Sequence, residues 1–372
     1  MKSRFVHDAV IQAPGIAVSG GDGTGRIQHL HAFRGFAIAN IVLLHVFSLV
    51  LDFNMTHAGL SPAEKWIYIF NEVMFHDSTI YFALISGLLF SVVLRRRGWN
   101  RFFRSKLTNV IAPFAVMSLL FTLVDRFYYG ASAAGDPRMG LLGKYLLNLW
   151  HGTAQLSYWY IPVIVVLFAA TPLLNSLVTG RHAGMGIIVM ASLPRFLSRT
   201  GREVSMGTVV YFAGVYSVGI FFGEGYAGNL AFLRRWRGTL GAIAAASTVA
   251  LVLLYTRDID MIGRVSIRES LFYVQKLAFC GLILCYMQRW EKHLPGALDQ
   301  LAVYSFAIYF MHQFVTRFII HFSKTMFPPP LGGWMVVALS IVLCGLVLAS
   351  SCVISRAVQG LCGRHSKWLI GA

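Results

Sequence analysis

Charged residues are scarce in this sequence. They make up 13% of its 372 residues, against about a quarter in ordinary soluble domains. Apolar residues, by contrast, account for 56% of the chain. This balance excludes an ordinary soluble globular protein and predicts a membrane protein that crosses the bilayer many times.

Cysteine is also rare, and its pattern is uninformative for metal binding. The chain has five cysteines, an odd number, and contains no C-x-x-C pair. A disulfide framework and a zinc site are therefore both disfavoured. We expect packing roles for these cysteines and no metal cofactor.

Negative charge is the third scarcity. The 32 basic residues outnumber the 15 acidic ones and give a net charge of +17. In a soluble protein such an excess would suggest nucleic-acid binding, but here the bases lie mainly between apolar segments. A positive-inside topology signal and contact with anionic membrane lipids explain them better, and we expect no nucleic-acid partner.

Long apolar segments are what the chain does contain. A span needs about 20 apolar residues, and ten segments meet or approach that length: 33–51, 67–94, 108–126, 157–178, 184–198, 206–222, 238–256, 270–288, 301–321 and 333–355. The fifth is short and is interrupted by Pro194. The sequence therefore predicts an all-α polytopic membrane protein with about ten transmembrane helices.

The domain organisation follows from these segments. Residues 1–28 lack the apolar core of a secretory signal, and "GDGTG" in this stretch lacks the Lys-Ser/Thr of a phosphate-binding loop. We interpret residues 1–28 as a flexible cytoplasmic tail, 29–356 as one transmembrane domain, and 357–372 as a second cytoplasmic tail.

The basic residues predict the orientation. The segment Arg95–Lys106, "RRRGWNRFFRSK", holds six bases and no acid. With ten spans, this segment, the cluster at 234–237 and the C-terminal tail all fall on one side together with the N-terminus. The positive-inside rule assigns that side to the cytoplasm. Arg199 and Arg202, near the fifth segment, do not follow the rule.

The first span, "HAFRGFAIANIVLLH" from His31 to His45, holds two ionisable residues. Arg34 and His45 are eleven residues apart, which is within about 20° of three whole helical turns and about 16 Å along the axis. Both side chains therefore share one helix face. This face suits an extended ligand with its anionic end at Arg34 and its reactive end at His45, as the pantetheine arm of coenzyme A would allow. A snorkelling arginine and a packed histidine are the alternative.

The second span contains a group of polar residues in its outer half. Glu72 and His76 are four residues apart, and Asp77 follows directly. A carboxylate at this depth needs a partner, which His45 or a base on another span could supply. These residues are candidates for orienting a general base or for binding a polar acceptor. The alternative for Glu72 is that it lies at the membrane interface in contact with water.

The ninth span contains "YSFAIYFMHQF", with His312 at about the depth of His45. Two histidines at one level could flank a polar cavity, with His312 binding substrate. A structural histidine bonded to a carbonyl or hydroxyl group is the alternative. Near the outer end of the fourth span, "SYWYIP" is either an aromatic membrane anchor or an anchor with an added sugar-binding role.

The basic loop offers candidates for phosphate binding. Arg101, Arg104 and Lys106 lie close along the chain to the mouth that Arg34 marks. Arginine and lysine bind phosphate groups through charge-assisted hydrogen bonds. Topology and lipid contact alone also explain these residues, and the two interpretations are compatible.

These blocks together resemble the acyltransferase-3 family of integral membrane O-acyltransferases. The first span is similar to that family's leading motif, an LRG-type start followed by an apolar run ending in histidine. The blocks "IYFALISGLLFS", "VIAPF", "WYIPVIVVLFAATPLL" and "YSFAIYFMHQ" resemble its later motifs and occur in the same order over nearly the whole chain.

The resemblance implies a catalytic His45, an essential Arg34, and an acyl-CoA donor, most commonly acetyl-CoA, that approaches from the cytoplasm. One block departs from the pattern. Where the family has R-x-x-R before its proline motif, this chain reads "KLTNVIAP", with Lys106 and Asn109 one place out of register. The bases that contact the donor are therefore left open among Arg101, Arg104 and Lys106.

The function expected from these observations is transfer of an acyl group, acetyl above all, from acyl-CoA to a hydroxyl of a carbohydrate or glycan. His45 would act as general base, and Asp77 or another buried acid would fix its tautomer. The resemblance also implies a bacterial inner membrane. A proton-coupled transporter or flippase of a glycan or lipid-linked intermediate is the main alternative, and an inactive acyltransferase-like membrane partner is another.

Overall fold

The computed structural model describes residues 27–55, 59–128, 140–196, 199, 203–263, 265–326 and 329–372. Most of the predicted N-terminal tail, the centre of the loop at 127–156, and Arg202 lie outside these residues.

The first half of the chain is helical. It comprises α1 (Gln28–Asn54), α2 (Pro62–Phe75), α3 (Thr79–Leu89), a π-helical turn (Phe90–Leu94), a 3₁₀ turn (Arg95–Arg97), α4 (Trp99–Lys106), a second π-helical turn (Leu107–Ile111), α5 (Ala112–Tyr128), α6 (Leu141–His151), α7 (Tyr160–Val178), α8 (Ala183–Ser192) and a 3₁₀ turn (Leu193–Arg195).

The second half adds one small hairpin to a further set of helices. It comprises α9 (Met206–Glu224), α10 (Tyr226–Arg235), α11 (Arg237–Thr256), β1 (Met261–Ile262), β2 (Val265–Ser266), α12 (Ile267–Arg289), a 3₁₀ turn (Glu291–His293), α13 (Gly296–Val303), α14 (Ser305–Met326), α15 (Gly333–Cys362), a 3₁₀ turn (Gly363–His365) and α16 (Ser366–Ile370). Strands β1 and β2 pair antiparallel, with Met261 opposite Ser266 and Ile262 opposite Val265.

The fold class predicted from the sequence is confirmed. Among the described residues, eight helical stretches are long and apolar enough to cross a membrane: Gln28–Asn54, Pro62–Arg97, Trp99–Phe127, Tyr160–Val178, Met206–Glu224, Arg237–Thr256, Ile267–Arg289 and Gly333–Ile370. The predicted fifth span corresponds to the shorter apolar stretch Ala183–Arg195, and the predicted ninth corresponds to α14. The molecule is an all-α polytopic membrane protein.

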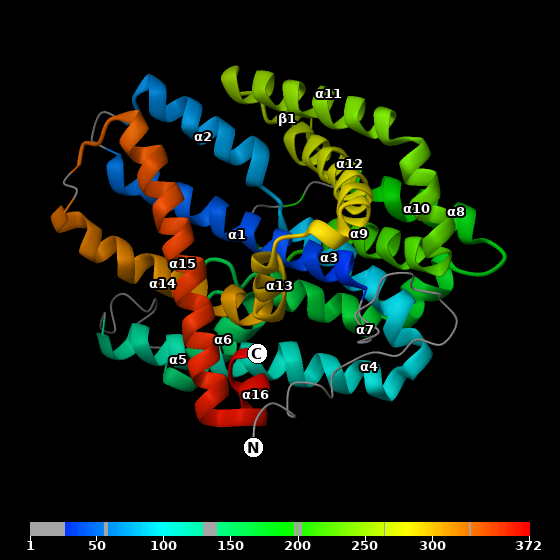
Figure 1. The fold of residues 1–372 in the computed structure, drawn as a ribbon, viewed down its shortest axis with the longest axis horizontal. Helices are drawn as coiled ribbons and strands as arrows, with labels where there is room; N and C mark the ends of the chain where they lie inside the picture. Colours follow the sequence, from blue (N-terminus) through cyan, green and yellow to red (C-terminus); the bar gives the residue numbers. More distant parts are fainter. Residues whose placement is uncertain are drawn as a thin grey trace.

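Helix α1 is the central element of the bundle (Figure 1). It packs against α2, α3, α12, α13, α14 and α15, which is possible because apolar residues cover most of its circumference. At Gly35 the neighbouring helix α13 approaches closely, and a Cβ atom there would lie 2.2 Å from the carbonyl oxygen of Leu298.

Most of the predicted basic segments meet at one end of the bundle. Arg95, which follows α3, forms an ion pair with Glu224 at the end of α9. His29, near the start of α1, contacts Glu291 after α12 and Tyr226 at the start of α10. We call this end, with Arg95–Lys106, the α10–α11 turn and the last turn of α12, the basic end.

The segment 357–372, which the sequence predicts to be a C-terminal tail, includes the end of α15 and the short helix α16. Helix α16 packs against α5, and its Ile370 is buried. The Ser366 hydroxyl donates to the Ala372 carbonyl at 2.5 Å. Apolar side chains within this short segment account for its packing, since they leave water for the bundle.

Helices α3 and α9 cross at very short range because glycines face backbone on the opposite helix. A Cβ atom on Gly87 would lie 2.1 Å from the Tyr216 carbonyl oxygen, and one on Gly219 would lie 2.2 Å from that of Leu84. Small residues allow such close backbone contact between membrane helices.

This crossing gives a stability prediction. Gly219→Ala should force the two helices apart and cost about 1–3 kcal/mol of folding free energy, as overpacking typically does. The measurement is the thermal unfolding midpoint of the purified protein in detergent. Gly241→Ala on α11 is the matched control, because nothing lies within 4 Å of a Cβ there. Equal midpoints for the two variants would contradict the close crossing.

Candidate active site

One face of α1 is directed at α14. The Arg34 guanidinium donates a hydrogen bond to the Ser305 hydroxyl at 2.8 Å. Further along both helices, the His45 and His312 rings lie 5.3 Å apart between centroids, with 35° between their planes. The prediction that Arg34 and His45 share one helix face, and that His45 and His312 reach the same depth, is therefore confirmed.

Backbone hydrogen bonds determine the tautomer of His312. Its Nδ1 lies 3.1 Å from the Ile308 carbonyl oxygen and 2.9 Å from that of Tyr309. Carbonyls only accept hydrogen bonds, so Nδ1 carries the proton and Nε2 of the neutral ring is an acceptor. The His312 side chain is fully buried, and Nε2 has no hydrogen-bond partner among the described residues. The result is a fixed proton acceptor directly beside His45.

More unpartnered polar atoms occur on α14 and at the start of α7. Within the described part of the chain, buried side-chain atoms of Gln313, Ser157 and Tyr160 also lack a hydrogen-bond partner. The segment before α7 is held against α14, because the Tyr158 hydroxyl donates to the Phe310 carbonyl at 2.8 Å. Buried polar groups are normally paired, so this region suits a polar ligand or ordered water.

The cations predicted to bind the donor are divided by the structure. Lys106 lies close enough to Arg34 for their charges to interact, and its ammonium group lies 4.3 Å from the centre of the Phe168 ring. Arg101 and Arg104 are instead exposed on α4. The structure thus brings Lys106 to Arg34.

A π-helical turn directly follows Lys106. It covers Leu107–Ile111, and such a turn holds one residue more than an α-helical turn does. The basic residue and the proline of this block are separated by one extra residue relative to the family pattern. The π-helical turn lies between Lys106 and Pro113, the stretch in which this chain has the extra residue.

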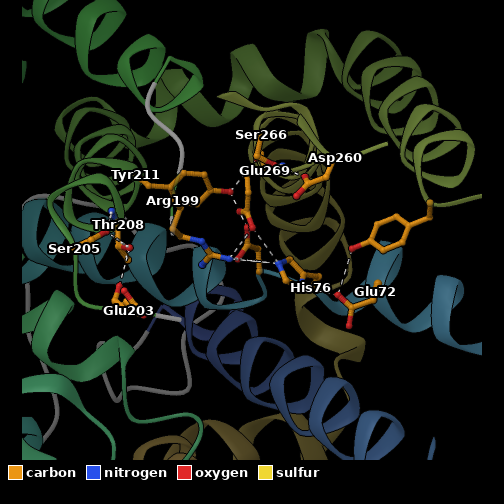
Figure 2. A network of polar contacts seen from close by, with 12 residues as sticks. Glu72, His76, Arg199, Glu203, Ser205, Thr208, Tyr211, Asp260, Ser266 and Glu269 are labelled. Atoms are coloured by element: carbon orange, nitrogen blue, oxygen red, sulfur yellow. Dashed lines mark hydrogen bonds and ion pairs between the residues drawn. The ribbon is translucent and has the colours of Figure 1, made fainter. Parts of the chain in front are cut away.

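Asp77 belongs to a second polar cluster rather than to His45. Its carboxylate contacts the Arg199 guanidinium at 2.7 Å and accepts a hydrogen bond from the Tyr211 hydroxyl at 2.7 Å. Arg199 also donates to Glu269 at 3.2 Å. Figure 2 shows Arg199 extending from its loop towards Glu269 and His76. Among the described residues, the contacts of Asp77 thus lead to other helices and not to His45.

A break between α2 and α3 positions Asp77. The predicted continuous helix over 67–94 is interrupted here, because Asp77 adopts a left-handed backbone conformation with φ of +56°. Aspartate tolerates this conformation better than most residues. Ser78 donates to the Phe75 carbonyl at 2.6 Å. The break turns the carboxylate towards Arg199.

His76 and Glu72 are members of the same cluster. His76 Nδ1 lies 2.8 Å from Glu72, and Nε2 lies 3.3 Å from the Arg199 guanidinium. Glu72 in turn accepts from the Tyr255 hydroxyl at 3.4 Å. Both predicted acceptor-binding residues are thus engaged with protein groups in this structure.

Three members of this cluster could ligate a cation. The ligand atoms of His76, Asp77 and Glu269 all lie within 4.8 Å of one another. The Arg199 guanidinium already contacts both carboxylates, so it supplies the positive charge that a metal would bring. Burial acts to lower the pKa of Arg199, but the Asp77 and Glu269 carboxylates raise it above its usual value. We interpret the cluster as a compensated ion network.

Sequence reasoning missed three members of this region. The sequence patterns identified Arg199 only as an exception to the topology rule and did not single out Glu269. Lys276, within the eighth predicted span, is fully buried, and its ammonium group donates to the Met74 carbonyl at 2.6 Å. A lysine in an apolar span is itself a signal, and it could have identified this residue.

The fold and the site define a multi-pass membrane protein in which the His45 and His312 rings lie side by side and Arg34 lies on the same face of α1. The family described as "Acyltransferase domain" (Acyl_transf_3) matches residues 27–356. The chain therefore belongs to this family and is a transferase, as the resemblance predicts.

A relative supports the same assignment. The chain is 22% identical over 317 residues to a Bacillus subtilis (strain 168) protein named "Putative membrane-bound acyltransferase YfiQ", covering 78% of this chain and 81% of the relative. No solved structure matches the chain.

The ion network gives a stability prediction. Arg199→Met removes the cation that contacts both Asp77 and Glu269 and should cost about 3–5 kcal/mol, measured as a lower thermal midpoint in detergent. Arg195→Met is the control, because among the described residues the Arg195 guanidinium donates a hydrogen bond only to the nearby Ser192 hydroxyl. Adding Asp77→Asn to Arg199→Met should restore part of the loss. A wild-type midpoint for Arg199→Met would contradict the network.

Proposed function

We propose that this protein transfers an acyl group, acetyl in the simplest case, from coenzyme A to a hydroxyl group of a carbohydrate acceptor. The observation that carries this proposal is the His45–His312 pair, in which His312 is buried and His45 is half-buried, with His45 on the same face of α1 as Arg34. Coenzyme A thioesters have their reactive carbonyl at one end and phosphate groups at the other. A histidine base inside the bundle suits the carbonyl, and a cation such as Arg34 suits the phosphates.

The proposed reaction begins with neutral His45 as general base. Its ring takes the proton from the acceptor hydroxyl while the hydroxyl oxygen attacks the thioester carbonyl carbon. The tetrahedral intermediate then collapses, the carbon–sulfur bond breaks, and the imidazolium returns its proton to the leaving thiolate. The products are an ester and coenzyme A, and no external base is consumed.

We assign to His312 the orienting role first considered for Asp77. Its unprotonated Nε2 can accept a hydrogen bond from one ring nitrogen of His45 and leave the other free of the proton. Asp77 is unsuited to this role, because Arg199 and Tyr211 already occupy its carboxylate. His312 is then a positioning residue, and the neighbouring unpartnered atoms of Gln313, Ser157 and Tyr160 can bind acceptor hydroxyls.

The donor is proposed to enter at the basic end. Arg34 and Lys106 are the two cations that the structure brings together, and Arg101 and Arg104 are exposed beyond them. Paired cations bind phosphate oxygens with charge-assisted hydrogen bonds. The positive-inside rule assigns this end to the cytoplasm, where coenzyme A is available, and we propose a bacterial inner membrane as the location.

The acceptor is proposed to arrive from the opposite end. Glu72 and His76 lie towards that end, but their contacts are within the ion network. We therefore give them an indirect role, in which the network holds α2 and α3 in place beside the acceptor path.

The first functional prediction concerns the base. His45→Ala should lower thiol release from acetyl-CoA in the presence of acceptor by about 10²–10⁴-fold, the usual contribution of a general base. The assay uses purified protein in detergent with a panel of glycans, and labelled products are identified by mass spectrometry. His182→Ala, at an exposed histidine, is the matched control.

Two results would overturn this assignment. Wild-type turnover by a correctly folded His45→Ala protein would exclude His45 as base. Wild-type protein that moves a glycan across vesicles but releases no thiol with any acceptor would favour the transporter alternative.

The second functional prediction concerns the donor. Arg34→Gln and Lys106→Gln should each raise the KM for acetyl-CoA about 10-fold to 100-fold, since a hydrogen bond to a charged group contributes about 1.5–3 kcal/mol. Turnover at saturating donor should change much less. Arg104→Gln is the comparison, because Arg104 is exposed and apart from Arg34. A larger effect at Arg104 than at Lys106 would instead place the donor at the exposed arginines of α4.

A further inference from the structure

A cavity at the basic end lies outside the site described above. Its volume is about 430 Å³, and its lining consists of Arg234, Arg237, Cys285, Tyr286, Gln288 and Arg289. These residues come from α10, α11 and the last turns of α12. Since α1, α4 and α14 contribute no lining residue, the cavity is distinct from the proposed donor entrance at Arg34 and Lys106.

The cavity is strongly cationic. Three of its six lining residues are arginines, and none is acidic. Among the described residues, no ion pair or hydrogen bond engages the side chains of Arg234, Arg237 or Arg289, whereas Arg95 at the same end is paired with Glu224. The first residue of α11 is Arg237, so the positive end of that helix dipole adds to the field. This arrangement suits an anionic ligand.

Exposed aromatic side chains occur in the cavity lining and in the turns adjoining it in the sequence. Tyr286 lines it and is about half exposed, and Phe232, Trp236 and Trp290 in the adjoining turns are exposed to a similar extent. Exposed tryptophan and tyrosine beside arginine are typical of the level at which lipid headgroups lie. Basic pockets between membrane helices at that level bind anionic lipid headgroups.

One polar atom in the lining indicates a hydrogen-bond donor on the ligand. The amide oxygen of Gln288 is buried and has no hydrogen-bond partner among the described residues. A phosphate diester has no donor to offer it, but a headgroup with hydroxyl groups has one.

We propose that this cavity binds the headgroup of an anionic phospholipid of the adjacent leaflet. The phosphate contacts Arg234, Arg237 and Arg289, and a headgroup hydroxyl donates to Gln288. The site ties α10, α11 and α12 to the membrane surface at the basic end. It does not depend on the acyl-transfer reaction.

Native mass spectrometry of the full chain in detergent tests the site. The probe is dioleoylphosphatidylglycerol, and zwitterionic dioleoylphosphatidylcholine is the comparison lipid. Arg234→Gln/Arg237→Gln/Arg289→Gln should weaken the tightest phosphatidylglycerol binding about 100-fold, at about fivefold per cation near an anionic headgroup. The matched control is Arg97→Gln/Arg235→Gln/Arg364→Gln, which removes the same charge outside the cavity and should retain tight binding.

A second variant tests the hydroxyl contact. Gln288→Leu should reduce the preference for dioleoylphosphatidylglycerol over dioleoylphosphatidylmethanol, which has the same charge and no headgroup hydroxyl, by about 2-fold to 10-fold. An unchanged preference would remove Gln288 from the site.

Three outcomes would overturn the proposal. The first is retention of tight phosphatidylglycerol binding by the cavity variant, and the second is equal loss in the control variant. The third is displacement of the lipid by micromolar inorganic phosphate or coenzyme A, which would assign the cavity to a soluble phosphate ligand. A thermal midpoint near that of the wild type shows that each variant is folded.

Discussion

The structure depends on one constraint, that polar groups inside a bilayer must find their partners within the protein. Two solutions coexist around α1. On one side of α1, the positive charge of Arg199 compensates the carboxylates of Asp77 and Glu269. Lys276, on the same side, donates a hydrogen bond to a backbone carbonyl. Towards α14, the polar groups are the neutral-capable rings of His45 and His312. The ion network is thereby separate from the His45–His312 pair, whereas Arg34 contributes a fixed charge elsewhere on the same face of α1.

How much the sequence could predict differs between these two places. Helical periodicity was sufficient to place Arg34 and His45 on one helix face. The order and direction of the spans were sufficient to place His312 at the depth of His45. The partner of Asp77 was not predictable in this way, because Arg199 lies outside any apolar segment. The direction of the Asp77 carboxylate depends on a left-handed backbone conformation between α2 and α3. Such a conformation has no periodic signal.

The basic loop shows the same limit in a different form. Linear spacing left Arg101, Arg104 and Lys106 as equivalent candidates for donor binding. The fold separates them, because the two arginines are exposed on α4, whereas Lys106 at the end of α4 lies close enough to Arg34 for their charges to interact. The π-helical turn Leu107–Ile111 follows Lys106 directly. A π-helical turn holds one residue more than an α-helical turn and so shifts the helix faces of the residues that follow. The distribution of apolar residues along the sequence does not reveal it. The departure from the family pattern at this block was therefore the informative signal.

For the proposed base His45, a neutral histidine is a better neighbour in this fold than a carboxylate would be. A fixed negative charge beside His45 would favour the imidazolium before the acceptor arrives and would need its own compensation in an apolar core. His312 avoids both effects, because its Nδ1 proton is held by backbone carbonyls and its Nε2 can only accept. It can orient His45 while leaving the ring neutral at rest. The compensated carboxylates of the ion network then serve the architecture, by fixing the helix break from which α3 runs towards α9.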